Sequence, residues 1–453
     1  MASGKQRFRF LPMAALALIA FGAIGWDVVQ ERRIDDLQFA GRRVVFLEAE
    51  NVRLRAALAE EERKKASAAD AGQRAAVEKA VVGIRGLAFL RPVVYDVVTK
   101  QGIKETLRRK MNALFSDADV RNAAIGFAAL GLMDPGYPLR EKYLDLLGEQ
   151  VAAFYDQHQH KLFMFEHASL ENSQNRVVLA HELTHALQDQ HFGLMNLPLE
   201  TKDDDDEAIA ASALVEGDAT MVMSEYMLSN FSWHGLRDSF SGVMSQNMNQ
   251  LQSAPRFLRE MLMFPYLRGQ EFCEALAAQG GYPAISAAFA HPPSSTTQIL
   301  HPEKYMAQPR EEPIRVAWKE TAVLGQVPLC DNVLGEMGMR VLITDWLDAA
   351  TGQSAAAGWR GDRYLVYDGG GALVWKSLWA TPESASRFAA ALKQCLEKRY
   401  KIDSSKAVEG AGSFSVKEPR AIHLLSPAPN EVLLIDASTA QWSDALFRQF
   451  AAR

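Results

Sequence analysis

The feature that most constrains this chain is a short motif of ionisable residues inside an apolar helical stretch. The motif is H-E-L-T-H at residues 181–185, and its immediate neighbours on both sides are apolar. Residues four apart lie on the same face of an α-helix, so the imidazoles of His181 and His185 can bind one metal ion together. The adjacent Glu182 then reaches a water molecule on that ion as a general base. The motif predicts a catalytic Zn²⁺ site on a helix over residues 172–190, and two ordinary helix histidines are the alternative.

A catalytic zinc site needs a third protein ligand and an open position for water. His191 stands six residues after His185, but the extended motif with that spacing needs glycine where this chain has Gln188. Glu216 lies in a second predicted helix over residues 207–228, among apolar neighbours. A carboxylate buried there is costly without a partner, and zinc is a good partner. We therefore favour Glu216 over His191, with a buried salt bridge as the alternative for Glu216.

These segments resemble a known family. Residues 178–192, with the H-E-x-x-H motif, and residues 213–220, with an E-G-D-A sequence, are similar to bacterial zincins of the gluzincin type. Residues 291–305 and 358–364 resemble the same group, so the likeness extends over about residues 83–396. The resemblance implies a zinc metallopeptidase with a twisted sheet beside the active-site helix.

The resemblance also implies roles for individual residues. His181, His185 and Glu216 would bind the zinc ion, and Glu182 would activate water for attack on a peptide bond. The substrate would be a protein or a peptide, but the resemblance does not identify which one.

Other supporting roles are hypotheses from position. Peptide hydrolysis forms an oxyanion that needs a donor besides the metal, and His301 is the leading candidate, with Tyr226 and Tyr305 as others. An ordinary hydrogen-bonding role is the alternative for each. Asp218 is a weaker candidate for holding a ligand histidine, because helical spacing turns it away from the third ligand. Residues 160–165 are expected to form an edge strand beside the motif helix, where an extended peptide can pair, and an ordinary buried strand is an equally good interpretation.

The N-terminal segment indicates attachment to a membrane. Basic residues precede an apolar run of 17 residues from Phe10 to Trp26, which is short for a membrane span. A cleaved signal peptide is the alternative. We expect an uncleaved anchor over residues 1–29, because the sequence continues directly into a helical pattern. The protein would then be a single-pass protein of the bacterial inner membrane, with its catalytic domain in the periplasm.

The next segment, residues 30–82, is predicted to be a helical stalk. It contains no proline and allows about three heptads, with Asn51 at one of the inward-facing positions. A parallel coiled coil would make the protein a homodimer through this stalk. A single charged helix that acts as a spacer is an equally good interpretation.

The composition of the chain supports a folded, globular part after the stalk. A hydrophobic fraction of 48% supports a buried core, and a net charge of −6 gives no general attraction to nucleic acid. Three scattered cysteines without a C-x-x-C pair exclude a cysteine zinc site. We expect an α+β protein: a membrane helix, a helical stalk, a zincin-like and mostly helical catalytic domain over residues 83–311, and a small α+β region over residues 312–453.

Two other functions stay open at this point. A catalytically silent relative would keep zinc as a structural tie and act as an envelope scaffold or adaptor. The presence of Glu182 argues against it, because a structural site needs no base. A zinc amidase acting on cell-wall peptide would use the same residues on a different amide.

Overall fold

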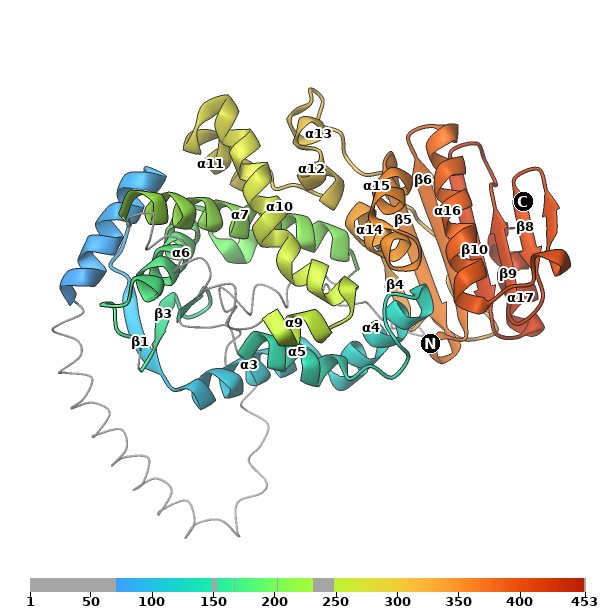
Figure 1. Cartoon of the computed structure of the whole chain (residues 1–453), viewed down its shortest axis with the longest axis horizontal. Helices are drawn as coiled ribbons and strands as arrows, with labels where there is room; N and C mark the ends of the chain where they lie inside the picture. Colours follow the sequence, from blue (N-terminus) through green and yellow to red (C-terminus); the bar gives the residue numbers. More distant parts are fainter. Residues whose placement is uncertain (1–70, 149–152, 167, 202, 231–247, 452–453) are drawn as a thin grey trace, which may run out of the picture.

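The computed structural model describes residues 71–451, apart from residues 149–152, 167, 202 and 231–247 (Figure 1). The predicted anchor over residues 1–29 and the heptads of the predicted stalk lie outside these residues. The last part of the stalk is described, and residues 71–85 are helical. The expected fold class is corrected in one respect: within the described residues, no helix is both long and apolar enough to cross a membrane.

A small sheet of three strands lies beside the motif helix. The strands are β1 (Val94–Val98), β2 (Ala153–Asp156) and β3 (Lys161–Phe165), in the order β1-β3-β2. β1 runs parallel to β3, and β2 runs antiparallel to it. The prediction that residues 160–165 form an edge strand is therefore wrong, because β3 is central. The edge strand that contacts the motif helix most is β2.

Helices make up most of the region around this sheet (Figure 1). They are α3 (Lys100–Leu114), α4 (Asp117–Leu130), α5 (Leu139–Gly148), α6 (Ser173–Phe192), α7 (Asp205–Asn230), α9 (Met248–Ser253), α10 (Arg256–Gly280), α11 (Tyr282–Ala290), α12 (Thr296–Leu300) and α13 (Pro302–Met306). The helices predicted over residues 172–190 and 207–228 are confirmed as α6 and α7, each within two residues of its predicted bounds.

Helices α7 and α10 approach each other very closely. A Cβ atom on Gly217 of α7 would lie 2.1 Å from the carbonyl carbon of Gly269 in α10. A Cβ atom on Gly269 would lie 2.1 Å from the carbonyl oxygen of Ala213. Only glycine allows the two backbones to come this near. The glycine of the E-G-D-A sequence therefore brings α10 up against the part of α7 that carries Glu216.

The C-terminal region is an antiparallel sheet of seven strands in the order β4-β5-β6-β10-β9-β8-β7. The strands are β4 (Cys330–Asn332), β5 (Trp359–Tyr367), β6 (Ala372–Trp379), β7 (Val408–Gly410), β8 (Ser413–Val416), β9 (Ala421–Leu425) and β10 (Glu431–Ala437). The helices are α14 (Gly335–Trp346), α15 (Ala349–Ala356), α16 (Pro382–Tyr400) and α17 (Ala440–Leu446).

Helices pack on both faces of this sheet. On one face, Phe388 of α16 stacks on Trp379 of β6, with ring centroids 4.5 Å apart. On the other face, Trp442 of α17 lies 5.5 Å from the ring of Tyr367. Alternate residues of a strand point to opposite faces, so each strand contributes to two separate cores. One of these cores continues without a break into the helical region, from Met111 of α3 to Leu434 of β10.

Candidate metal centre

The motif helix is buried on every side where it carries the motif. Asn172 caps its first turn by accepting a hydrogen bond from the backbone N–H of Gln174, and Gly193 ends it in the left-handed conformation at φ 68°. Between these ends, the side chains from Leu179 to Asp189 are all buried. Apolar residues on both sides of the motif, such as Leu179 and Leu187, keep this part of the helix in the interior, and the motif's histidines and glutamate are buried with them.

The structure brings together His181, His185 and Glu216. The Nε2 atoms of the two imidazoles lie 3.1 Å apart, and Oε2 of Glu216 lies 3.1 Å from His181 Nε2 and 3.5 Å from His185 Nε2. One ligand atom from each residue lies within 4.8 Å of the others. α6 supplies the two imidazoles one turn apart, and α7 supplies the carboxylate from across the helix interface. Three such donors that face one point suit a cation with tetrahedral preference.

The donor set fits a zinc ion in a further respect. Oε1 of Glu216 is buried and has no hydrogen-bond partner among the described residues. Burial opposes the charged form of this carboxyl, but the two imidazoles outweigh it and lower the pKa of Glu216 to about 2. An ionised carboxylate in the interior needs a compensating positive charge. A metal ion meets that need, and a proton on His185 is the alternative, since the same contacts also describe a buried ion pair.

Glu182 lies on α6 beside the cluster of His181, His185 and Glu216, and a hydrogen bond from the edge strand β2 holds its side chain in place. Its Oε2 accepts a hydrogen bond of 2.8 Å from the backbone N–H of Tyr155 in β2, and only 2% of the residue is exposed. Burial raises the pKa of Glu182 well above its ordinary value, while the charge of His185 and the N–H of Tyr155 act against this rise. When it is ionised, the Glu182 carboxylate is therefore a stronger base than an exposed glutamate.

The other residues considered from the sequence lie elsewhere. His191 Nε2 contacts the carbonyl oxygen of Ala88 at 2.8 Å and takes no part in the cluster. His301 Nε2 lies 2.9 Å from Glu336 on α14, and its imidazole also contacts Arg340. Two tyrosines complete the set: Tyr305 donates to the carbonyl of His291, and Tyr226 lies near the end of α7. None of these contacts joins the cluster.

Sequence reasoning missed Tyr266, which lies against the cluster. It belongs to α10, it is 9% exposed, and its ring is stacked on that of His181 with centroids 6.0 Å apart. Burial and then the charges of Glu216 and Glu182 raise the pKa of Tyr266 well above its usual value, so its hydroxyl stays protonated. The sequence offers no spacing rule that links Tyr266 to the motif. The only unusual sequence feature next to Tyr266 is Pro265, because proline is rare inside a helix.

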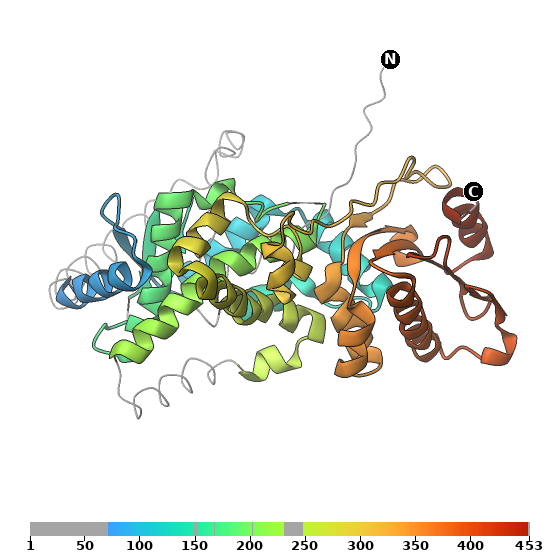
Figure 2. The ribbon, with the colours of Figure 1, turned by 90° about the horizontal axis from the view of Figure 1, so that it is seen from above.

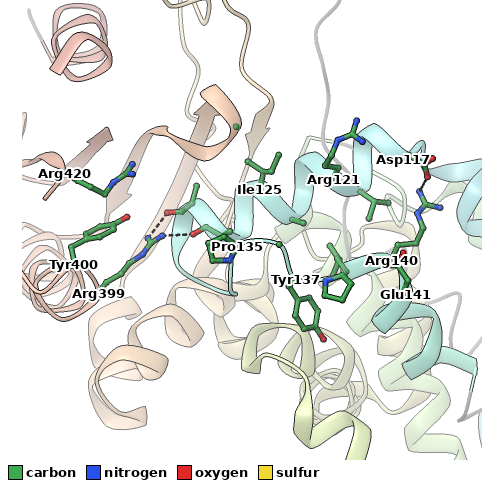
Figure 3. Close-up of a pocket in the computed structure, with 18 residues that line it drawn as sticks. Asp117, Arg121, Ile125, Pro135, Tyr137, Arg140, Glu141, Arg399, Tyr400 and Arg420 are labelled. Atoms are coloured by element: carbon green, nitrogen blue, oxygen red, sulfur yellow. Dashed lines mark hydrogen bonds and ion pairs between the residues drawn. The ribbon is translucent and has the colours of Figure 1, made fainter. Parts of the chain in front are cut away.

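A separate cavity of about 760 Å³ opens between α4, α5 and the C-terminal region (Figure 3). It is lined by residues that include Arg121, Tyr137 and Arg399, and by no member of the metal cluster. Its arginines are largely engaged, since Arg399 donates to backbone carbonyls of α4 and Arg140 pairs with Asp117. We assign it no role in the chemistry of the metal centre.

Comparison with known proteins adds one family match. Residues 326–446 match the model of a domain of unknown function, DUF8575, and this range contains all seven strands of the sheet and helices α14 to α17. A search of curated proteins gave no match, and a search of solved structures gave none either. The match does not include the metal cluster, so the chemistry of the centre must be argued from its own residues.

Proposed function

We propose that this chain is a zinc-dependent hydrolase that cleaves peptide bonds in a protein or peptide substrate. The observation that carries the proposal is the convergence of His181, His185 and Glu216 on one point, with Glu182 on the same helix as the two histidines. A structural zinc site closes its coordination with four protein ligands, whereas a set of three leaves one position open. The likeness of the two motif segments to gluzincins supports the same proposal.

Each residue of the proposed site has its own role in the reaction. His181, His185 and Glu216 would hold the ion. Zinc in such a site lowers the pKa of a water molecule at its open position and polarises a carbonyl group. Glu182 accepts the proton of the attacking water and later passes it to the leaving amine. The backbone N–H of Tyr155 orients Glu182 for this task, because it occupies one carboxylate oxygen at 2.8 Å.

The direct test is replacement of the base without loss of the metal. We expect the full-length protein to bind about one zinc ion and to cleave unfolded casein. Glu182→Gln keeps the shape of the side chain and its contact with Tyr155 but accepts no proton, so cleavage falls roughly 10²–10⁴-fold while zinc is retained. Zinc content and cleavage of fluorescently labelled casein are measured side by side.

The control is His191→Ala, because His191 lies outside the cluster and its loss leaves both zinc and cleavage unchanged. Folded protein that takes up no zinc overturns the proposal. Zinc binding without cleavage of casein, in parent and variant alike, points instead to a scaffold. Release of products from purified cell wall alone points to an amidase.

A further inference from the structure

Behind the metal cluster, buried polar contacts lead away from His185. Its Nδ1 lies 2.9 Å from Oε1 of Gln188. The amide nitrogen of Gln188 donates to Asp218 Oδ2 and to the carbonyl oxygen of Val215, each at 2.9 Å. Because both amide protons are used, the amide oxygen is the atom that faces His185. His185 Nδ1 must then carry the proton of the ring, and its Nε2 keeps the lone pair that a metal ion needs.

The contacts continue from Asp218 to the helix that precedes β1. Arg85 is the last residue of the helix over residues 71–85, and its Nε lies 2.9 and 3.1 Å from the two carboxylate oxygens of Asp218. Both side chains are almost fully buried, with 1% and 0% exposed. Arg85 is fixed in turn by α11, since Nη1 donates to Ser286 Oγ at 3.0 Å and the guanidinium lies over the ring of Tyr282.

We propose that Arg85 is a positioning residue of the metal centre. By pairing with Asp218, it holds that carboxylate against the amide of Gln188, and the amide fixes the tautomer and orientation of His185. The helix over residues 71–85 therefore completes the centre, although both ligand helices come later in the chain. The inference rests on the zinc site of the proposed function and does not depend on peptidase activity.

A purely structural ion pair makes a different prediction. If Arg85 and Asp218 only stabilise the packing of three helices, their replacement lowers the stability of the protein but leaves the affinity of the folded protein for metal unchanged. If they act through Gln188, the affinity itself falls, because groups that orient a ligand histidine typically affect metal affinity 10–100-fold. Affinity and the geometry of the bound metal therefore decide between the two roles.

The experiment uses the full-length protein and three variants of one helix. Zinc affinity is measured by competition with a chromogenic chelator, and the site geometry is followed by the visible absorption of bound Co²⁺. We expect Arg85→Met to weaken zinc binding roughly tenfold or more and to change the Co²⁺ spectrum. Arg85→Lys, which keeps the charge, restores part of the affinity. Lys79→Met removes an exposed charge from the same helix and leaves both readouts unchanged.

A second set of variants covers the case in which Arg85→Met fails to fold. Arg85→Met/Asp218→Leu removes both buried charges, so no lone charge is left inside. It is expected to weaken zinc binding as well, because Gln188 loses its anchor. Gln188→Met is expected to have the same effect with the ion pair intact. Adding Arg85→Met to Gln188→Met then produces no further loss of zinc affinity, because the two residues act through the same series of contacts to His185.

The outcomes separate this inference from the proposed function. Folded Arg85→Met, or the folded double variant with Asp218→Leu, overturns the inference if it binds zinc as tightly as the parent with an unchanged Co²⁺ spectrum. The proposed function survives that result. A parent that binds zinc but cleaves no protein counts against the proposed function alone. A folded parent that binds no zinc overturns both.

Discussion

Tyr266 places a phenol group beside His181, on a helix that carries none of the three candidate metal ligands. Its ring is stacked on His181, and burial together with nearby carboxylates keeps its hydroxyl protonated as a donor. We predict that Tyr266→Phe lowers kcat about 10²–10³-fold, the usual cost of losing one donor to the oxyanion. The zinc content stays the same and KM changes less than kcat. Steady-state kinetics on a peptide substrate with parallel zinc analysis test this.

Tyr305→Phe is the matched control for this prediction. Its hydroxyl donates to the backbone carbonyl of His291 at 2.8 Å, so it does not donate to an oxyanion at the cluster. We expect an unchanged kcat. Equal kcat values for Tyr266→Phe and the parent would remove the tyrosine from the mechanism.

His301 was the donor favoured by the sequence, and its surroundings give it another task. The carboxyl of Glu336 is buried, and hydrogen bonding from His301 and the charge of Arg340 overcome that burial and hold its pKa below the usual value. We predict that His301→Ala costs about 1.5–3 kcal/mol of stability, as expected for a hydrogen bond to a charged group. Urea unfolding measures the loss, and kcat is expected to stay unchanged. A large fall in kcat with full stability would return His301 to the active site.

At the scale of single residues, the sequence predicts what lies within one helix better than what meets across helices. The spacing of His181 and His185 fixes their common face, and burial cost singles out Glu216. Asp218 looked poorly placed because helical spacing turns it away from Glu216. It reaches His185 only through Gln188, and that link depends on how α6 packs on α7. Tyr266 and Arg85 are likewise brought in by packing between elements.

Among the elements, the contact of α7 with α10 sets the geometry around the cluster. Gly217 and Gly269 meet backbone to backbone, and Tyr266 lies one turn before Gly269 on α10. We predict that Gly217→Ala costs about 1–3 kcal/mol of stability, since its Cβ has no space and the helices must move apart. It is also expected to lower kcat, because Tyr266 moves with α10. Thermal unfolding and steady-state kinetics measure the two effects.

Gly72→Ala is the matched control, because a Cβ at Gly72 meets no atom within 4 Å. It lies in an exposed helical segment, where alanine is favoured over glycine by about 0.5–1 kcal/mol. We therefore expect no loss of stability and no change in kcat. If Gly217→Ala behaves in the same way, the close approach of the helices has no importance for the site.

The elements themselves were predictable to different degrees. The start of α16 can be read from the sequence, because Pro382 is favoured in the first turn of a helix. The strand around residues 160–165 was predicted, but its pairing with β1 and β2 was not. β3 pairs in parallel with β1, across three intervening helices and the β2 strand, and alternation of side chains carries no information on such distant pairing. The short strands β7 and β8 give too few residues for a periodic pattern.

On the scale of the whole molecule, helices α6 and α7, which carry the candidate cluster, and the seven-stranded sheet lie toward opposite ends of an elongated body (Figure 2). One continuous core nevertheless runs from α3 to β10 and includes α7, the helix that carries Glu216, whereas the apolar residues of α6 form a second core with β2 and β3. Polar contacts support the junction: Arg399 of α16 donates to the carbonyls of Ala128 and Ala129 at the end of α4, at 2.6 and 2.7 Å. The carbonyl of Ala129 belongs to the last turn of α4, where carbonyl groups lack a partner within the helix, and that of Ala128 also accepts from the N–H of Gly131.

A shared core predicts that zinc stabilises the two regions together. A ligand that binds only the folded state raises its stability by an amount set by the free concentration and the dissociation constant. At a free zinc concentration roughly 100 times the dissociation constant, we expect the free energy of unfolding to rise by about 2.7 kcal/mol. The chain should unfold in one transition, detected alike near the cluster and by the tryptophans of the sheet, such as Trp375 and Trp379, and chelation should lower its midpoint. Glu216→Gln should abolish the effect of zinc. Two transitions, with zinc moving only the one near the cluster, would mean that residues 326–446 fold independently and that the continuous core does not couple them to the metal centre.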